Sequence, residues 1–251
     1  MLFPDPLRRG RLVRRYKRFL ADVEWIDAVG DEEPAVTAHC ANPGSMMGLA
    51  DPGCEVWLSP ARNPDRKLRW TLELVRAPST GALVGVNTSL PNRLVEEALD
   101  AGIVTELDGY ARRRREVRYG DRSRVDFLLE DDARPPCYVE VKSVTLARPE
   151  LSPGSAGPAG PAAEFPDAVT ARGAKHLGEL ATVVASGGRA VLLYVVQRGD
   201  CDHVRVAGDI DPAYAAALSA ARAAGVECLA YRCGIDTGGI AISGPPLPVE
   251  Q

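Results

Sequence analysis

No stretch of this 251-residue sequence is apolar enough to cross a membrane. The longest strongly apolar run, Ala190–Val196, is far shorter than the roughly 18 to 20 residues that a membrane helix requires. The N-terminus carries arginines but no apolar segment behind them, so it does not fit a secretory signal. The six cysteines are scattered and form no Cys-x-x-Cys pair, which argues against a zinc ribbon and for a reducing compartment. We therefore expect a cytoplasmic protein with no membrane partner.

Extremes of composition are also missing. Hydrophobic residues make up 45% and charged residues 25%, which excludes collagen, coiled coil and wholesale disorder. Lysine is scarce, with only four among 30 basic residues. A compact ammonium can serve as a catalytic group where a permanently charged guanidinium cannot, so each lysine deserves inspection.

The net charge of −4 hides a strong segregation. Residues 1–20 hold seven basic residues against one acid, and residues 110–125 hold seven against two. Because exposed charges are screened beyond about 8 Å at physiological salt, a polyanion near these segments would feel their local positive potential. The alternative is that both runs are ordinary solvated strand faces.

The first ninety residues have the pattern of β structure cut by turns. Turn sequences such as Asn42–Ser45, Asp51–Gly53 and Asn63–Asp65 separate the apolar segments. Five short strands without a long helix favour a small closed barrel, with the OB type as the leading candidate. The expected strands are Arg11–Val23, Val36–Cys40, Cys54–Leu58, Leu68–Val75 and Ala82–Asn87.

The pattern changes after Leu90, so we predict one domain over residues 1–88 and a second over 89–251. Pro91 fits the first position of a helix that ends near Gly102. Strand, helix and strand then alternate, which favours an α/β domain with a mixed sheet. The expected strands are 116–119, 123–130, 137–146, 189–197, 203–207 and 226–231, the helices are 167–185 and 211–224, and 147–163 is a flexible Gly/Pro/Ala-rich insertion.

The most informative segment for chemistry is a predicted hairpin. Two candidate strands, Ser123–Glu130 and Cys137–Ser143, flank a short turn. If they pair antiparallel around the middle of that turn, Asp126 stands opposite Glu140. Because strand side chains alternate, Lys142 then points to the same side as Glu140. Two carboxylates and an amine therefore meet on one face.

Directly opposed like charges destabilise a sheet, so something must compensate for this pair. A divalent cation is the simplest answer, because Mg²⁺ takes one or two carboxylates and completes its shell with water and phosphate oxygens. Mn²⁺ is the alternative ion. The Val141 carbonyl could join Asp126 and Glu140 as a ligand, while Lys142 orients or deprotonates the attacking water. The alternative is an accidental Glu-x-Lys spacing held as an ordinary ion pair.

Several motifs together resemble the sugar fermentation stimulation protein A family of DNA-binding proteins. They are Arg15–Asp22, Val36–Cys40, Asn42–Met46, Val86–Asn92, Ser123–Phe127, Tyr138–Val144, Phe165–Thr170, Arg172–Leu177 and Ala190–Arg198. The resemblance implies an N-terminal OB-type barrel, a PD-(D/E)xK nuclease-like domain and non-specific DNA binding. It puts Asp126, Glu140 and Lys142 on metal-binding and catalytic positions. Val125 stands where the superfamily name has proline. Nucleases of this type often draw a further carboxylate from the preceding helix, which points to Glu97 rather than Glu96.

The predicted nucleic-acid contacts come from both domains. In the barrel, cations alternate with aromatics as on a nucleic-acid platform, and on the later helix an Arg, Lys and His share one face. A solvated surface is the alternative for each. The residues are Arg14, Arg15, Tyr16, Lys17, Arg18, Arg114, Arg115, Arg124, Arg172, Lys175 and His176.

Three functions remain, in order of preference. The first is a Mg²⁺-dependent nuclease acting on DNA, with RNA as a further substrate class. The second is a DNA-binding regulator linked to sugar metabolism, in which the nuclease fold has no catalytic role. The third, an enzyme of sugar phosphates, lacks a recognisable phosphate loop. No sequence feature distinguishes single-stranded from double-stranded substrates, or indicates a sequence preference or an oligomeric state.

Overall fold

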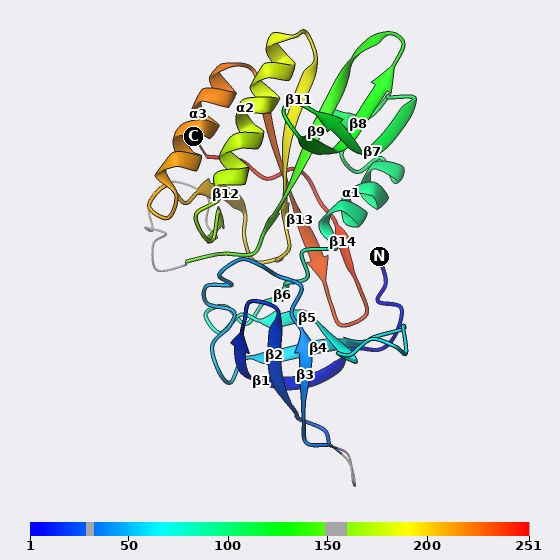
Figure 1. Cartoon of the computed structure of the whole chain (residues 1–251), viewed down its shortest axis with the longest axis vertical. Helices are drawn as coiled ribbons and strands as arrows, with labels where there is room; N and C mark the ends of the chain where they lie inside the picture. The colour runs from blue at the N-terminus through cyan, green and yellow to red at the C-terminus, as the bar shows by residue number, and fades with distance from the viewer. Residues whose placement is uncertain (29–32, 149–159, 251) are drawn as a thin grey trace.

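A computed structural model describes residues 1–28, 33–148 and 160–250 of the chain. Figure 1 shows a β barrel formed by the N-terminal strands, next to a second domain in which helices cover a long sheet. The predicted combination of an OB-type barrel and an α/β domain with a mixed sheet is confirmed. No helix in the described part is long and apolar enough to cross a membrane.

The barrel closes through five strands in the order β3-β2-β1-β4-β5, with a parallel contact between β3 and β5 at His39 and Thr71. Apolar side chains at alternating positions, such as Leu12, Val23 and Leu72, fill its interior. A sixth strand, β6, adds to the free edge of β5. The bounds are β1 Arg8–Tyr16, β2 Leu20–Trp25, β3 Ala35–His39, β4 Glu55–Pro60, β5 Trp70–Arg76 and β6 Leu83–Gly85.

Two of the expected barrel strands were wrong. The segment 11–23 is a hairpin rather than one strand, because Lys17 and Arg18 adopt positive φ values of 49° and 62° and reverse the chain. Neither residue is a typical turn residue, so local pattern did not indicate the reversal. The segment 82–87 supplies only the short β6, and the hairpin provides the fifth barrel strand instead.

The second domain is a six-stranded sheet in the order β14-β13-β11-β9-β8-β7. Strands β9, β11 and β13 are parallel to one another and the other pairings are antiparallel, so the sheet is mixed as predicted. The strands are β7 Arg112–Tyr119, β8 Ser123–Asp131, β9 Arg134–Val144, β11 Arg189–Val196, β13 Glu227–Ile235 and β14 Ile240–Ile242, and a separate parallel pair is formed by β10 Ala162–Phe165 and β12 His203–Val206.

Helices cover both faces of this sheet (Figure 1). On one face, Leu94 and Val95 of α1 pack against Val139 and Val141. On the other face, α2 and α3 lie side by side over Leu192 and its neighbours. The bounds are α1 Pro91–Asp100, a short 3-10 turn Thr105–Leu107, α2 Ala171–Ala185 and α3 Pro212–Ala223.

The helix ends follow local chemistry. α1 begins at Pro91, and Gly102 beyond its end has a φ of 64°, as predicted. α2 begins four residues later than expected, because the Thr170 hydroxyl accepts a hydrogen bond from the Gly173 N–H and caps it there. The expected insertion 147–163 ends in β10, and its residues 149–159 lie outside the described part of the chain.

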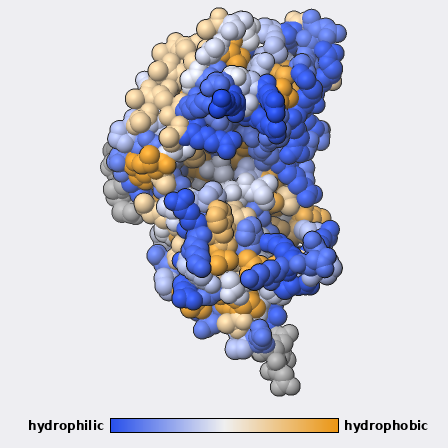
Figure 2. Space-filling model, in the orientation of Figure 1, coloured by the Kyte–Doolittle hydropathy of each residue, from blue (hydrophilic) through white to orange (hydrophobic). Residues whose placement is uncertain are grey.

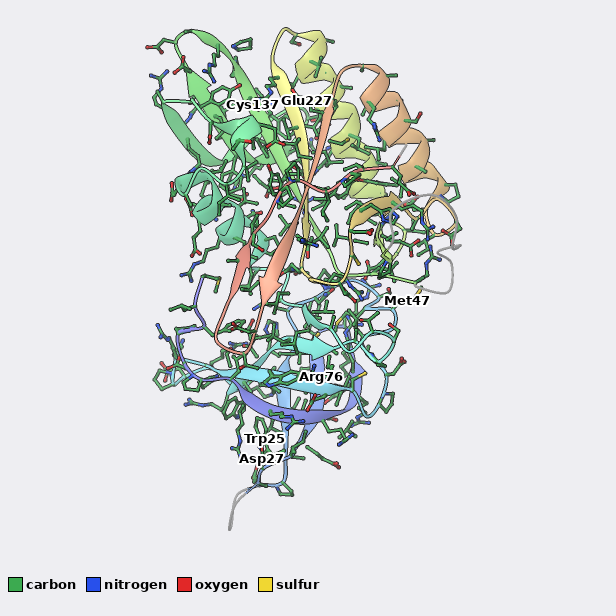
Figure 3. The ribbon with its side chains drawn as sticks, turned by 180° about the vertical axis from the view of Figure 1, so that it is seen from behind. Trp25, Asp27, Met47, Arg76, Cys137 and Glu227 are labelled. Carbon is green, nitrogen blue, oxygen red and sulfur yellow. The ribbon has the colours of Figure 1, made fainter. Side chains whose placement is uncertain are left out.

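The two domains are joined by backbone contacts. Val84 of β6 forms an antiparallel bridge with Arg198, and the Gly85 N–H donates to the Gln197 carbonyl (2.9 Å). Figure 3 labels Cys137 and Glu227, on β9 and β13, at the end of the sheet away from the barrel. These parallel strands therefore run towards the barrel, and their C-terminal residues lie close to it.

Candidate metal and nucleic-acid site

The β8/β9 hairpin has the predicted register where the two strands pair. Phe127 pairs with Val139, and Leu128 pairs with Tyr138. The ladder stops at the Phe127 pair, one step before the two acids. In its place, the Val141 N–H donates to Asp126 Oδ2 at 2.7 Å. Where the ladder ends, the backbone N–H of Val141 on β9 is therefore free to bind the Asp126 carboxylate on β8.

The Val141 carbonyl lies on the same side as its N–H. The Val144 carbonyl accepts a hydrogen bond from the Gln197 N–H (2.9 Å), just beyond the end of β11. Carbonyls alternate in direction along a strand, so every second carbonyl of β9, counted from Val144, points to β11. The N–H and C=O of one strand residue point to the same neighbour, so the Val141 carbonyl faces Asp126 and not β11. The Val141 carbonyl and the Asp126 carboxylate thus lie on the same side of β9.

Glu140 is buried, with 3% of its surface exposed. Its Oε1 accepts a hydrogen bond from Lys142 Nζ (2.7 Å) and contacts His176 Nδ1. Burial alone would raise the pKa of Glu140, but the His176 and Lys142 contacts outweigh it and hold the pKa below its usual value. The second oxygen, Oε2, is buried and has no hydrogen-bond partner among the described residues.

The surroundings of Asp126 shift its pKa in the opposite direction. Burial raises the pKa of Asp126, and the nearby Glu140 charge raises it further. Its Oδ2 accepts the Val141 N–H, and its Oδ1 accepts a hydrogen bond from Asn92 Nδ2 (2.7 Å). The charge of Glu140 thus acts on Asp126, and of the two carboxylates only Glu140 has a cationic partner within hydrogen-bond distance.

Lys142 lines a cavity of about 450 Å³ between the domains. The barrel loop 42–44 and residues 164–170 supply most of its other walls. The ammonium is bonded to Glu140, but 13% of the side chain remains exposed. The lysine is therefore within reach of solvent although it forms an ion pair.

The donor set suits a hard divalent cation that keeps water ligands. The unpartnered Glu140 Oε2 and the charge on Asp126 offer two carboxylates, and Mg²⁺ needs no more than one or two. Nowhere in residues 1–28, 33–148 and 160–250 do three His, Cys, Asp or Glu side chains gather to hold a metal by themselves. An ion here would therefore complete its shell with the Val141 carbonyl, water and substrate.

Glu97, the third predicted acidic residue, does not join this group. Its carboxylate pairs with the Met1 ammonium (2.7 Å) and with Arg93 (3.1 Å). Five residues along a helix turn the side chain by about 140°, so Glu97 lies well away from the Asn92 side of α1. Glu96 pairs with Arg113 and Arg115 instead. Sequence reasoning missed Asn92, whose only signal is its place in the first turn after Pro91.

Of the predicted α2 residues, only His176 reaches the carboxylates. Arg172 Nε donates a hydrogen bond to His176 Nε2 (3.3 Å). Because Nε2 accepts, the hydrogen of the imidazole ring is assigned to Nδ1, which contacts Glu140. His176 is itself buried and so holds Glu140 rather than facing solvent. Lys175 Nζ donates to the Asp121 carbonyl (2.5 Å).

The predicted basic strand β7 starts earlier than expected, at Arg112, and most of its arginines are paired. Arg115 contacts Glu96, and Arg114 forms a two-pronged pair with Glu130 (2.8 and 3.0 Å). Arg124 faces Arg118 across the β7/β8 ladder, and within the described residues neither has an ion pair. Directly opposed cations destabilise a sheet, so this pair is suited to an anion.

The predicted barrel residues divide into two groups. Arg14 and Tyr16 both bond to Asp22, and Arg15 donates to the Asn42 (2.7 Å) and Gly44 (2.8 Å) carbonyls, so these three serve internal contacts. Lys17 and Arg18 lie in the exposed turn between β1 and β2. Only that turn is available to a partner without breaking an existing contact.

The fold and the site define a class: an OB barrel joined to an α/β domain whose hairpin carries two interacting carboxylates and a lysine. Residues 13–86 match the SfsA N-terminal OB domain, and residues 89–239 match the sugar fermentation stimulation protein RE domain. The chain belongs to the SfsA, or sugar fermentation stimulation protein, family. Membership and the OB domain suggest nucleic-acid binding.

Curated relatives match over nearly the whole length. The sugar fermentation stimulation protein homolog of Maricaulis maris (strain MCS10) is 54% identical over 245 residues, 98% of this chain and 97% of that protein. The homolog of Rhodospirillum centenum (strain ATCC 51521 / SW) is 55% identical over 242 residues, 96% of this chain and 97% of that protein. The solved structure of Pyrococcus furiosus SfsA in complex with Ca²⁺ aligns with a TM-score of 0.84 at 26% identity, over 100% of this chain and 98% of that chain.

Proposed function

We propose that this protein is a Mg²⁺- or Mn²⁺-dependent phosphodiesterase that acts on DNA, with RNA as a further substrate class. The observation that carries the proposal is the pair of interacting carboxylates beside a lysine that lines an interdomain cavity. The buried Glu140 oxygen without a partner supports a cation there. The Ca²⁺ complex of the related Pyrococcus furiosus protein adds support for a hard cation in this family.

In this proposal Asp126, Glu140 and the Val141 carbonyl hold the ion. When bound, such an ion would supply Lewis-acid chemistry: it would make a water more acidic and offset charge on a phosphoryl oxygen. Asn92 and the Val141 N–H fix the two Asp126 oxygens, and His176 fixes Glu140. Lys142, at the cavity wall, orients the attacking water or stabilises the charge that develops on the phosphate.

The test compares purified wild type with Asp126→Asn and Lys142→Ala on single-stranded DNA, duplex DNA and RNA, with Mg²⁺, Mn²⁺ or EDTA. Both variants should lose metal-dependent cleavage and keep most of their affinity for duplex DNA. Asp132→Asn, on the exposed turn of the same hairpin, is the matched control and should cleave normally. If both variants still cleave, the activity belongs to a contaminating nuclease or to another site, and the assignment is wrong.

A non-catalytic DNA-binding protein is the second candidate. It is favoured by one observation: Lys142 forms an ion pair with Glu140 and His176 contacts the same oxygen, so the cluster is partly satisfied without an ion. This candidate predicts no cleavage of any substrate with either metal. It also predicts binding that weakens with salt, with a log–log slope of about −0.9 for each phosphate contacted on duplex DNA.

A further inference from the structure

A basic loop that the sequence predictions did not include connects β4 and β5. Residues 61–69 hold Arg62, Arg66, Lys67 and Arg69 against the single acid Asp65. Within the described residues only Arg62 forms an ion pair, an exposed one with Asp5 (3.1 Å). Arg66 donates to the Thr71 hydroxyl and Arg69 to the Pro64 carbonyl, which leave their charges in place. The loop therefore keeps most of its positive charge.

This basic loop lines a cavity of about 760 Å³ on the barrel. Arg62, Arg66 and Lys67 form part of its wall, and His39 at the end of β3 forms another part. The nearest acid in the wall is Glu73, which is buried and bonded to Ser59 and Asn87. Burial raises the pKa of Glu73.

The outer face of β2 and β3 has the opposite character. The cavity beside it, about 660 Å³, is lined by three acids, Asp22, Glu24 and Glu33, and by two basic residues of the loop, Lys67 and Arg69. Asp22 also neutralises Arg14, the nearest arginine on β1. OB domains usually bind nucleic acid on this strand face and on the loops beside it. Here the carboxylates disfavour a polyanion on the strands but not on the basic loop.

The basic cavity leads towards the hairpin site across a short pair of segments, which we name the strap: residues 41–42 and 87–88. The Thr88 N–H (2.9 Å) and hydroxyl (2.8 Å) both donate to the Ala41 carbonyl. Ala41 and Asn87 line the basic cavity, whereas their neighbours Asn42 and Thr88 line the cavity that contains Lys142. The two cavities therefore lie on either side of one strap.

The acids near the second cavity are already occupied. Asp167 accepts from the Met46 N–H (3.1 Å), and Glu164 pairs with Arg148 and Arg205. On the barrel side, the Phe19 carbonyl accepts from the Cys40 N–H (2.8 Å), which sets the exposed Lys17–Arg18 turn beside the segment leading to the strap. Figure 3 labels Met47, just beyond this segment, at the level where the two domains meet. Cations thus lie on both sides of the crossing.

We infer that the phosphodiester backbone of one nucleic-acid strand runs along the basic loop and over the strap to Lys142, and not over the β2–β3 face. This inference rests on the proposed function and adds the route by which its substrate reaches the hairpin. The contacts are charge contacts to phosphate, so binding along this route is independent of base sequence. Figure 2 shows mainly hydrophilic residues, with hydrophobic groups scattered, on the face that it draws.

The test uses two matched double variants of the full-length chain. Arg62→Gln/Lys67→Gln removes two charges from the basic loop, and Arg11→Gln/Arg14→Gln removes two from the outside of the barrel. Each pair includes one arginine in an exposed aspartate pair, Arg62 with Asp5 or Arg14 with Asp22, so the cost in stability is similar. Thermal melts confirm that both variants fold.

Affinity for single-stranded and duplex DNA is measured in EDTA between about 50 and 200 mM salt. The basic-loop variant should reduce the log–log salt slope by about 1.4 on single strands and 1.8 on duplex, and the control should leave it unchanged. Equal effects of the two variants, or a larger effect of the control, would overturn the route. Because no metal is present, a missing nuclease activity cannot produce either result. A wild type that binds no nucleic acid would overturn the route and the proposed function together.

Discussion

Two buried glutamates, Glu73 in the barrel and Glu140 in the second domain, are held differently. Glu73 in the barrel has 7% of its surface exposed and takes neutral donors on both oxygens, the Ser59 hydroxyl (2.7 Å) and the Asn87 amide (2.9 Å). Glu140 in the second domain takes Lys142 and His176 on one oxygen and leaves the other without a partner. Burial raises the pKa of Glu73, whereas the contacts with His176 and Lys142 hold the pKa of Glu140 down despite burial.

The difference separates a structural carboxylate from one suited to a ligand. A buried carboxylate that only joins two parts of a fold needs both oxygens satisfied, because an unsatisfied buried acceptor costs about 1 to 3 kcal/mol. In Glu140 the unsatisfied acceptor is Oε2, and the lowered pKa favours the charged form of this carboxylate. A buried charged oxygen without a hydrogen-bond partner is unfavourable unless a ligand binds it. A cation on that oxygen removes the cost, and this is the basis of our proposal for the site.

The largest contrast is expected from the two isosteric variants Glu140→Gln and Glu73→Gln. Glu140→Gln should reduce metal-dependent cleavage roughly 10²-fold or more, the scale of losing a group that acts in the transition state. Glu73→Gln keeps a hydrogen-bonding side chain of the same size and should change the rate by less than about threefold. Initial rates on a labelled oligonucleotide measure both. Equal losses would remove the distinction between the two glutamates.

The next contrast concerns two buried histidines beside carboxylates. His176 contacts Glu140, whereas His203 contacts Asp202 (2.6 Å) and Glu250 (3.2 Å), away from the hairpin. His176→Leu should reduce cleavage about 10- to 100-fold, the usual effect of losing a residue that orients a metal ligand. His176→Asn retains a donor near the Nδ1 position and should recover part of the loss. His203→Leu should leave the rate of the folded protein unchanged, and a matching loss there would point to stability instead.

Helix α1 offers a third, smaller contrast. Asn92 bonds to Asp126, but Glu97 pairs with Met1 and Arg93 and is 41% exposed. Asn92→Ala should reduce cleavage about tenfold, at the low end for a residue that orients a ligand. Glu97→Gln should alter the rate less than about twofold, since the Glu97 carboxylate pairs with Met1 and Arg93 and not with a residue of the hairpin site. Abolition of cleavage by Glu97→Gln would restore the assignment that the sequence suggested.

The smallest expected effect is on how the free energy of unfolding changes with pH. Glu73 and Glu140 should change it in opposite directions. A raised pKa means that folded Glu73 binds a proton before the unfolded chain does, so its contribution to stability improves as pH falls towards the ordinary value of 4.5. The contribution of Glu140 is fully present above its ordinary value of 4.5 and is lost as pH falls below that towards the folded value. Relative to Glu73→Gln, the wild type should gain stability between pH 7 and about 5, the latter just above the pKa of an ordinary glutamate. Urea unfolding at both values measures this, and the reverse trend would contradict it.

Much of the hairpin could be predicted from local pattern. Side-chain alternation and a short turn are enough to set the register, and they put Val139 and Val141 on the face opposite Glu140 and Lys142. The barrel and the mixed sheet also follow from the spacing of turns, strands and helices. These features depend on neighbours close in sequence.

The features that sequence reasoning missed depend on contacts between distant segments. Asn92 meets Asp126 from another element, and Arg15 turns inwards because the carbonyls of a loop nearly thirty residues away accept its hydrogen bonds. The arginines of β7 were counted as available, but Glu96 and Glu130 neutralise several of them. The strap between the two cavities likewise depends on a distant contact, the hydrogen bond from the Thr88 N–H to the Ala41 carbonyl.

Binding of Mn²⁺ tests the central claim most directly, because it requires no substrate and no cleavage. Electron paramagnetic resonance of the folded protein should report bound Mn²⁺ for the wild type and for Glu73→Gln. Asp126→Asn and Glu140→Gln should each weaken that binding by at least about tenfold, since each removes one of the two charged ligands. Equal Mn²⁺ affinity in all four proteins would contradict the assignment of the ion to Asp126 and Glu140.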